Sequence, residues 1–211
     1  MSIFGSARIK ANTNEYAQVY ELAKKLAKNK TDVVTGGGPG LMEAANAGSK
    51  DGGSKTKSFG LHIDLPFETT PNDHLDITYH HKKFSSRLDE FMRISHAVIV
   101  TPGGIGTILE LLYTWQLIQV GHISERPVIL LGEMWNGLID WMESEPLKKH
   151  LIEKSDFKNI QIVQNVDEKW ARKKFEFNPL KIVSLLISLL FSSGILSIKL
   201  LISPLSYFSK N

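Results

Sequence analysis

Residues 97–110 read AVIVTPGGIGTILE, and this stretch decides the fold. Ala97–Thr101 is an apolar run, as is typical of a strand buried on both faces of a sheet. The glycine-rich turn Pro102–Gly106 follows, and a helical pattern then extends from Thr107 to about Val120. A strand that leads through a short glycine turn into a helix is the repeating unit of an α/β protein.

A second strand, turn and helix of this kind lies earlier in the chain. Asp32–Thr35 is predicted as a strand, Gly36–Gly40 as the turn and Leu41–Lys50 as the helix. The remaining apolar patterns alternate in the same way, with strands at Ser2–Phe4, Ser58–Ile63, Ile77–His81, Pro127–Leu131 and Ile160–Val163, and helices at Glu15–Lys28, Ser85–Ser95, Trp135–Trp141 and Pro146–Ile152. We therefore predict that residues 1–168 form a Rossmann-like, doubly wound parallel sheet with helices on both faces.

Both glycine turns are expected at the carboxyl ends of their strands, where such sheets bind ligands. A helix that starts there offers unpaired N–H groups to an anion, and glycine lets a ligand come close to the backbone. Two such turns suggest a ligand with a phosphate, or a phosphate and a sugar. The dinucleotide fingerprint is absent because Leu41 stands where its third glycine would be, and no Walker A tripeptide occurs. The structural alternative is that the turns only solve a tight backbone problem.

Composition narrows the functional classes. The 211 residues include no cysteine, which excludes a disulfide scaffold and a cysteine nucleophile and fits a cytoplasmic location. The net charge of +3 conceals a basic segment, residues 169–211, so the remaining body is slightly acidic and nucleic acid is not expected as a partner. The seven histidines show no metal-binding spacing and are interpreted as structural or surface residues.

Three polar residues could take part in ligand binding or catalysis: Arg87, Thr107 and Glu110. The spacing of Thr107 and Glu110 is that of a capping box, so one interpretation is purely structural. In the other, Thr107 binds phosphate and Glu110 faces a sugar, with the guanidinium of Arg87 as partner of the phosphate or the carboxylate. A carboxylate can stabilise the oxocarbenium-like state in which a ribosyl–base bond breaks. The sequence does not identify a proton donor for the leaving base.

These residues carry a resemblance to a known family. Thr35–Asn46 and Pro102–Glu110 resemble the paired signatures of the LONELY GUY (LOG) family of nucleoside 5′-monophosphate phosphoribohydrolases, many of which are mislabelled as lysine decarboxylases. Phe4–Arg8 resembles the family's first strand and loop, and the whole resemblance covers about residues 2–165. Many members have lysine directly after the arginine, where this chain has Leu88.

The resemblance implies a reaction and a set of site residues. The expected reaction is hydrolysis of AMP, or of a cytokinin riboside 5′-monophosphate, to the free base and ribose 5-phosphate. The resemblance implies a homodimer or larger oligomer and no metal or organic cofactor. It assigns catalysis to Arg87 and Glu110, and substrate or phosphate binding to Ser6, Gly36, Gly37, Gly38, Gly40, Met42, Pro102, Gly103, Gly104, Gly106 and Thr107.

Two other functions compete with hydrolysis. Some proteins of this fold resemble molybdenum-cofactor carriers, so a non-catalytic nucleotide or cofactor carrier is the first alternative. The retention of Arg87 and Glu110 argues against it. A membrane-tethered interaction protein built on a degenerate enzyme is the second.

The C-terminal part differs in composition from the rest. Residues 169–181 form a basic linker, and residues 182–211 form a hydrophobic tail for which a helix is predicted. Ile182–Ile202 has only one charge, Lys199, and is long enough to span a bilayer. Serines at 184, 188 and 192 form a small-residue stripe suited to helix packing in lipid. A helix docked on a partner subunit and an extension unrelated to the fold are the other interpretations.

Overall fold

Seven parallel strands form one sheet in the computed structural model, which describes residues 1–53, 55–64 and 70–164. The strand order is β4-β3-β2-β1-β5-β6-β7. The strands are β1 (Ser2–Phe4), β2 (Val33–Thr35), β3 (Ser58–Ile63), β4 (Ile77–His81), β5 (Val98–Val100), β6 (Val128–Leu131) and β7 (Ile160–Val163). The predicted Rossmann-like parallel sheet is confirmed.

The order of the strands reverses at β1. From β1 the chain moves to β2 on one side, and it later returns to place β5 on the other side. The loops that follow β1 and β5 therefore diverge and leave a crevice between them, which is where ligands bind in open α/β sheets.

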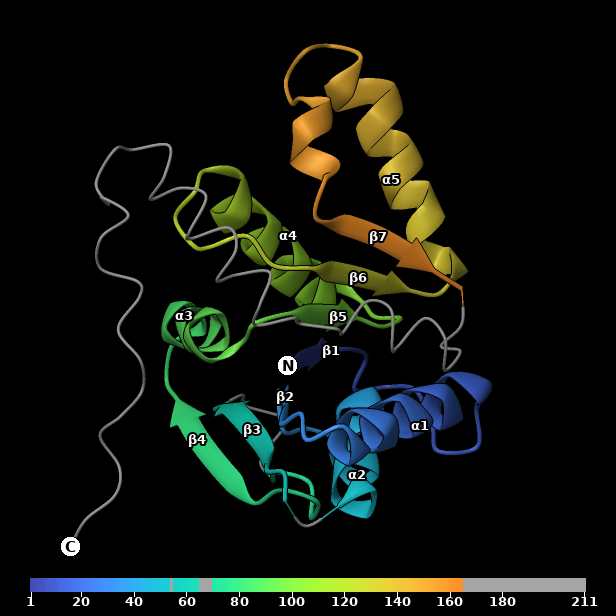
Figure 1. Ribbon diagram of the computed structural model, residues 1–211, viewed down its shortest axis with the longest axis vertical. Helices are drawn as coiled ribbons and strands as arrows, with labels where there is room; N and C mark the ends of the chain where they lie inside the picture. Colours follow the sequence, from blue (N-terminus) through green and yellow to red (C-terminus); the bar gives the residue numbers. More distant parts are fainter. Residues whose placement is uncertain (54, 65–69, 165–211) are drawn as a thin grey trace, which may run out of the picture. The chain divides into compact units, whose positions relative to one another are not determined.

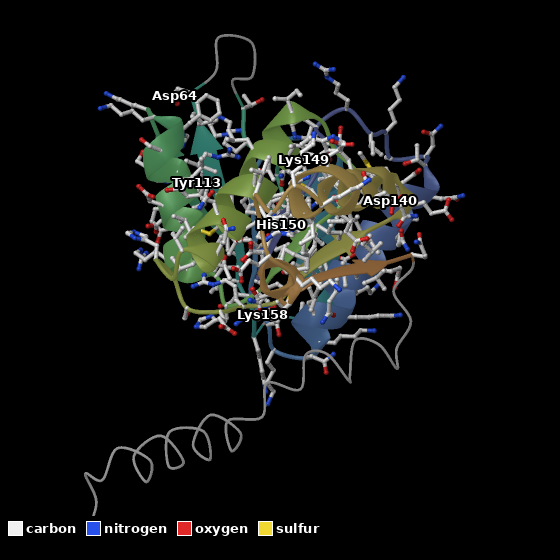
Figure 2. All side chains as sticks on the ribbon, turned by 90° about the horizontal axis from the view of Figure 1, so that it is seen from above. Asp64, Tyr113, Asp140, Lys149, His150 and Lys158 are labelled. Carbon is white, nitrogen blue, oxygen red and sulfur yellow. The ribbon has the colours of Figure 1, made fainter. Side chains whose placement is uncertain are left out.

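Helices cover both faces of the sheet (Figure 1). The helices α1 (Asn14–Lys28) and α2 (Leu41–Gly52) lie together on one face, whereas α3 (Phe84–Ile94) and α4 (Ile105–Gln119) lie on the other (Figure 1). Tyr113, on α4, lies toward α3 (Figure 2), and its hydroxyl donates a hydrogen bond to Asp89 of α3. The described residues also include short elements: the 3-10 turns at Glu133–Trp135 and Lys154–Phe157, α5 (Asn136–Met142) and the π-helical turn Glu143–Leu147.

The core beneath α3 and α4 positions the residues of interest. Phe4 of β1 packs edge-on against Phe91 of α3, with ring centroids 4.9 Å apart. Leu61, Phe91 and Leu111 are fully buried in the same cluster. Arg87 lies one helical turn before Phe91 on α3, so the packing of Phe91 on the sheet also fixes the position of Arg87 relative to the strands.

One predicted helix is absent, and the start of another differs from the prediction in a way that affects the site. Pro146–Ile152 is not a helix: the π turn that extends α5 ends at Leu147, and His150 has a positive φ of 55°, which a right-handed helix does not accommodate. The helix predicted from Thr107 starts two residues earlier, at Ile105. The second difference changes how Thr107 and Glu110 are interpreted below.

The predicted linker 169–181 and tail 182–211 lie outside the described residues, so the boundary at 168 and the three interpretations of the tail stay predictions. Within the part of the chain that the structure describes, no helix combines the length and the apolar character needed to cross a membrane.

Candidate active site

A cavity of about 500 Å³ opens where strands β1, β2, β3 and β5 end. It lies beside the crevice between β1 and β5, where the topology predicts a ligand. Its volume is within the range of small-molecule sites. Fifteen residues line it: Gly5, Ser6, Ala7, Arg8, Gly36, Met42, His62, Ile63, Phe84, Arg87, Gly104, Ile105, Gly106, Thr107 and Glu110.

Arg87 and Glu110 form an ion pair in this cavity. Arg87 Nη1 lies 3.2 Å from Glu110 Oε1, and each side chain is only about a tenth exposed, at 10% and 11%. Arg87 Nε also donates a hydrogen bond of 2.6 Å to the carbonyl oxygen of Leu61 on β3. The two predicted catalytic side chains, which are 23 residues apart in the sequence, are therefore brought together and held against the sheet.

The environment of Glu110 changes its acidity. Burial raises the pKa of Glu110 to about 7, because desolvation disfavours the charged carboxylate. Arg87 opposes this effect on the pKa through its charge and its hydrogen bond, but burial dominates. A carboxyl group with a pKa near 7 in a cavity can both accept and release a proton at neutral pH.

The lack of a side chain at Gly36 leaves the space that the Arg87 guanidinium occupies beside Glu110. A Cβ atom built on Gly36 would lie 2.2 Å from Arg87 Nη2 and 2.7 Å from Met42 Sδ. No real side chain could be accommodated there unless the guanidinium moved. The first glycine turn thus contributes Gly36 to the cavity, and the helix α2 that follows contributes Met42; both were predicted as site residues.

The N-terminus of α4 faces the cavity through Gly104, Gly106 and Thr107. Gly104 is the N-cap of α4, and no side chain of the described residues caps this helix. The first N–H groups of a helix have no intrahelical acceptor, so this end can bind an anion. The capping-box interpretation of Thr107 and Glu110 is wrong, because both residues lie inside the helix. The Thr107 side chain instead covers Gly103, whose Cβ would meet Thr107 Oγ1 at 2.1 Å.

Five predicted binding residues are not among those that line the cavity: Gly37, Gly38, Gly40, Pro102 and Gly103. They shape the turns instead. Gly40 has a positive φ of 69°, and its Cβ would lie 2.4 Å from the carbonyl oxygen of Ser6. That oxygen accepts a hydrogen bond from the N–H of Leu41, so the start of α2 is joined to the loop after β1. Pro102 joins the same loop, because its carbonyl oxygen accepts from the N–H of Ser6.

A hydrogen-bond network built on two asparagine side chains, the buried Asn46 and the partly buried Asn72, supports the first glycine turn. Asn46 Oδ1 accepts hydrogen bonds from Thr35 Oγ1 at 2.7 Å and from Asn72 Nδ2 at 3.0 Å. Asn72 Nδ2 also donates to the carbonyl oxygens of Gly37 and Gly38. The turn is thus fixed by its own strand, by the following helix and by the loop before β4.

Sequence reasoning missed several residues that line the cavity. Gly5, Ala7, Arg8 and Ile105 were not assigned to the site, and neither were Ile63 and Phe84. His62 is a further case: the histidines were interpreted as structural or surface residues, yet His62 lines the cavity and is 4% exposed. Its place at the carboxyl end of β3 was the available signal.

Comparison with known proteins provides an independent view of the chain. The chain is similar over 129 residues, at 32% identity, to the "Pyrimidine/purine nucleotide 5'-monophosphate nucleosidase" of Escherichia coli strain K12. The alignment covers 57% of this chain and 28% of that protein. Relatives from Escherichia coli O6:H1 and O157:H7 give the same figures. The chain therefore spans less than a third of the length of the curated relatives that it matches.

Solved structures confirm the fold. The molybdenum cofactor carrier protein from Chlamydomonas reinhardtii has a TM-score of 0.59 at 21% identity, with 82% of this chain and 95% of that chain covered. The molybdenum cofactor binding protein from Rippkaea orientalis has a TM-score of 0.55 at 21% identity, covering 90% and 95%. Similarity at this level of identity concerns the architecture alone.

A family model gives the assignment that these partial similarities do not. The model described as "Possible lysine decarboxylase" matches residues 42–172, which is more than half of the chain and includes Arg87 and the whole second glycine turn through Glu110. The chain belongs to this family, which is the LOG family.

Proposed function

We propose that this chain hydrolyses the N-glycosidic bond of nucleoside 5′-monophosphates, releasing the free base and ribose 5-phosphate. The observation that carries the proposal is the buried Arg87–Glu110 pair, which lies in one cavity with the uncapped N-terminus of α4. Family membership and the nucleosidase named among the relatives support a hydrolase that acts on a nucleotide.

The phosphate would bind at the N-terminus of α4. Gly104 and Gly106 have open space around them, so phosphate oxygens can approach the backbone N–H groups. The loop after β1 brings Ser6 and the exposed Arg8 to the same side of the cavity, since the N–H of Ser6 is bonded to Pro102 at 3.0 Å. Arg8 adds a positive charge that favours a dianion.

Glu110 and Arg87 would act on the sugar. Glu110 lies one turn into α4, so a phosphate at the start of the helix places the ribose near its carboxyl group. The ionised carboxylate stabilises positive charge that develops at C1′ and accepts a proton from the attacking water. Arg87 positions the substrate and the carboxylate of Glu110. Water adds to C1′ as the bond to the base breaks; the base leaves with the bonding electron pair and takes up a proton from solvent, while Glu110 holds the proton lost by the water.

The proposal also concerns the oligomeric state of the chain, because α4 exposes an apolar face. The side chains of Ile105, Leu109 and Leu112 lie on one face of α4 and are 83%, 43% and 41% exposed. An exposed apolar stripe of this kind favours association, and we propose that two copies pair through it as a homodimer. Cytoplasmic location stays a prediction, as does a role in cytokinin biosynthesis.

The proposal is tested with a panel of nucleoside 5′-monophosphates and the matching nucleosides. Chromatography of the products should show free base from the monophosphates and much less from the nucleosides, because the latter lack the group that binds α4. Glu110→Gln and Arg87→Ala should each abolish release while circular dichroism shows a folded protein. Undiminished release by both variants would reject the assignment.

The carrier alternative predicts a different outcome in the same experiment. A carrier would retain its ligand tightly through gel filtration and would release no base from any nucleotide. Rapid turnover that depends on Glu110 is incompatible with that function.

A further inference from the structure

We propose that Phe91 is a positioning residue for the catalytic pair, because its ring holds the guanidinium of Arg87 beside Glu110 from inside the core. This inference rests on the proposed function, which it deepens by assigning the residue that keeps Arg87 in place. Phe91 is not among the residues that line the cavity, so its effect on the reaction would pass through Arg87.

The guanidinium of Arg87 lies over the ring of Phe91. Its Cζ atom is 5.2 Å from the ring centroid, which is within the range of a cation–π contact. The two residues are four positions apart on α3, a spacing at which the side chains of a helix meet. Phe91 is 0% exposed and Arg87 is 8% exposed, so little water competes with the contact. A desolvated cation–π contact is stronger than one at the surface.

The ring of Phe91 is itself fixed by the sheet. It packs edge-on against Phe4 of β1, with an angle of 89° between the two ring planes. The strand β1 is the central strand of the sheet and pairs with both β2 and β5. The ring therefore gives the guanidinium a support whose position is set by the middle of the sheet.

The ring contact differs from the ion pair in a way that matters for catalysis. In the proposed reaction Glu110 takes a proton from water and becomes neutral, so its attraction for Arg87 weakens in that state. The ring contact and the hydrogen bond from Arg87 Nε to Leu61 do not depend on the charge of Glu110. They would keep the guanidinium in place until the carboxyl group releases its proton.

The acidity of Glu110 reports the position of Arg87. The other residues lining the cavity that can carry a charge are Arg87 from α3, His62 from β3 and Arg8 from the loop after β1. The charge and the hydrogen bond of Arg87 lower the pKa of Glu110 and so offset part of the effect of burial. A guanidinium that lost its support would provide less of this compensation, and the pKa of Glu110 would rise.

Carbon-13 NMR of the full chain without substrate measures the titration of Glu110. Its carboxyl signal is the one that disappears in Glu110→Gln. We expect Phe91→Leu to raise the pKa of Glu110 above that of the wild type and to lower kcat/KM for AMP about fivefold at pH 8. Replacement of Phe91 by pentafluorophenylalanine should act in the same direction, because it keeps the shape of the ring and removes the negative charge from its face.

Two controls separate positioning from general packing. Phe4→Leu removes the other ring of the same buried pair and leaves the ring under Arg87 in place. It should lower the free energy of unfolding by a similar amount but leave the titration of Glu110 unchanged. In an Arg87→Ala background, Phe91→Leu should cause no further shift in that titration, because the ring acts through Arg87.

The outcomes also separate this inference from the proposed function. An unchanged Glu110 titration in the Phe91 variants would overturn it, as would an equal shift in Phe4→Leu or a shift that persists without Arg87. If Phe91→Leu does not fold, the fluorinated ring decides between these outcomes. Absence of base release from the wild-type chain, with a Glu110 titration that still depends on Phe91, would instead reject the hydrolase and support the contact between the ring and Arg87.

Discussion

In the proposed function, a single buried carboxyl group, that of Glu110, carries out the chemistry in the cavity. Burial raises the pKa of Glu110 and Arg87 offsets only part of that effect, so that the pKa is about 7. If the ionised form is the active one, kcat/KM should fall as the pH decreases below about 7 and level off above it. A pH profile of kcat/KM with AMP measures this directly, since that parameter reports the free enzyme. A profile that stays flat between pH 5 and 8 would contradict the assigned role.

The same shift has a consequence for stability. An acid whose pKa is raised by folding destabilises the folded state when it ionises, so the penalty is absent below pH 4.5 and complete above pH about 7. The shift corresponds to about 3 kcal/mol. Wild-type stability should therefore decrease between pH 4.5 and 7, and Glu110→Gln should remove much of that decrease. Urea denaturation at pH 5 and pH 8 provides the comparison, and parallel changes in both proteins would rule out Glu110 as the cause.

Replacement of Gly36 should displace the Arg87 guanidinium while both Arg87 and Glu110 remain in the chain. Gly36→Ala places a methyl group 2.2 Å from Arg87 Nη2, so the guanidinium must move away from Glu110. We expect kcat to fall at least about tenfold because the positioning of the pair is lost. Gly137→Ala is the matched control, since no atom lies within 4 Å of its added Cβ. Steady-state kinetics of both variants decide the point: equal activity would show that the position of Arg87 does not matter.

Among the elements, α3 depends on a residue outside it. Arg126, which precedes β6, is buried and donates hydrogen bonds to the carbonyl oxygens of Met92 and Ser95 at the C-terminal end of α3. Burial lowers the pKa of Arg126 from its ordinary value. Its charge is well placed, because helix C-termini favour cations. The helix that carries Arg87 is thus fixed at both ends, by Arg126 at one and by the Arg87–Leu61 contact near the other.

Arg126→Met should therefore lower the free energy of unfolding by about 3 kcal/mol, because charged hydrogen bonds are lost and carbonyl oxygens are left without their partner. Arg93→Met is the control on α3 itself: that side chain pairs with Glu90 in solvent, and its loss should change stability little. Chemical denaturation of the two variants tests this. Similar midpoints would show that Arg126 does not hold the helix.

The elements also show what the sequence could and could not predict. Strands β3, β4 and β7 were predicted with their observed ends, because each is an apolar or β-branched run bounded by turn residues. The start of α4 was placed two residues late, since Gly104 and Gly106 weaken the helical pattern that the structure nonetheless adopts. Arg87 and Glu110 were identified through the family motif. His62, Phe84 and Asn72 were missed because their surroundings come from parts of the chain that are distant in the sequence, which residue spacing does not report.

At the scale of the whole molecule, the apolar face of α4 predicts self-association. Ile105 belongs both to this face and to the cavity, so a second copy would also cover the cavity mouth. Leu109→Glu combined with Leu112→Glu should give a folded monomer by sedimentation velocity and reduce activity. Val120→Glu, which changes an exposed apolar side chain just beyond the helix, is the control. A wild-type chain that sediments as a monomer would contradict this part of the proposal.

The most direct test of the central claim is the stoichiometry of AMP breakdown by the wild-type protein beside Glu110→Gln. If the Arg87–Glu110 pair catalyses hydrolysis at C1′, adenine and ribose 5-phosphate should appear in equal amounts from the wild-type protein, and neither should appear from the variant. Formation of inorganic phosphate and adenosine instead, or equal release of adenine by both proteins, would contradict the account.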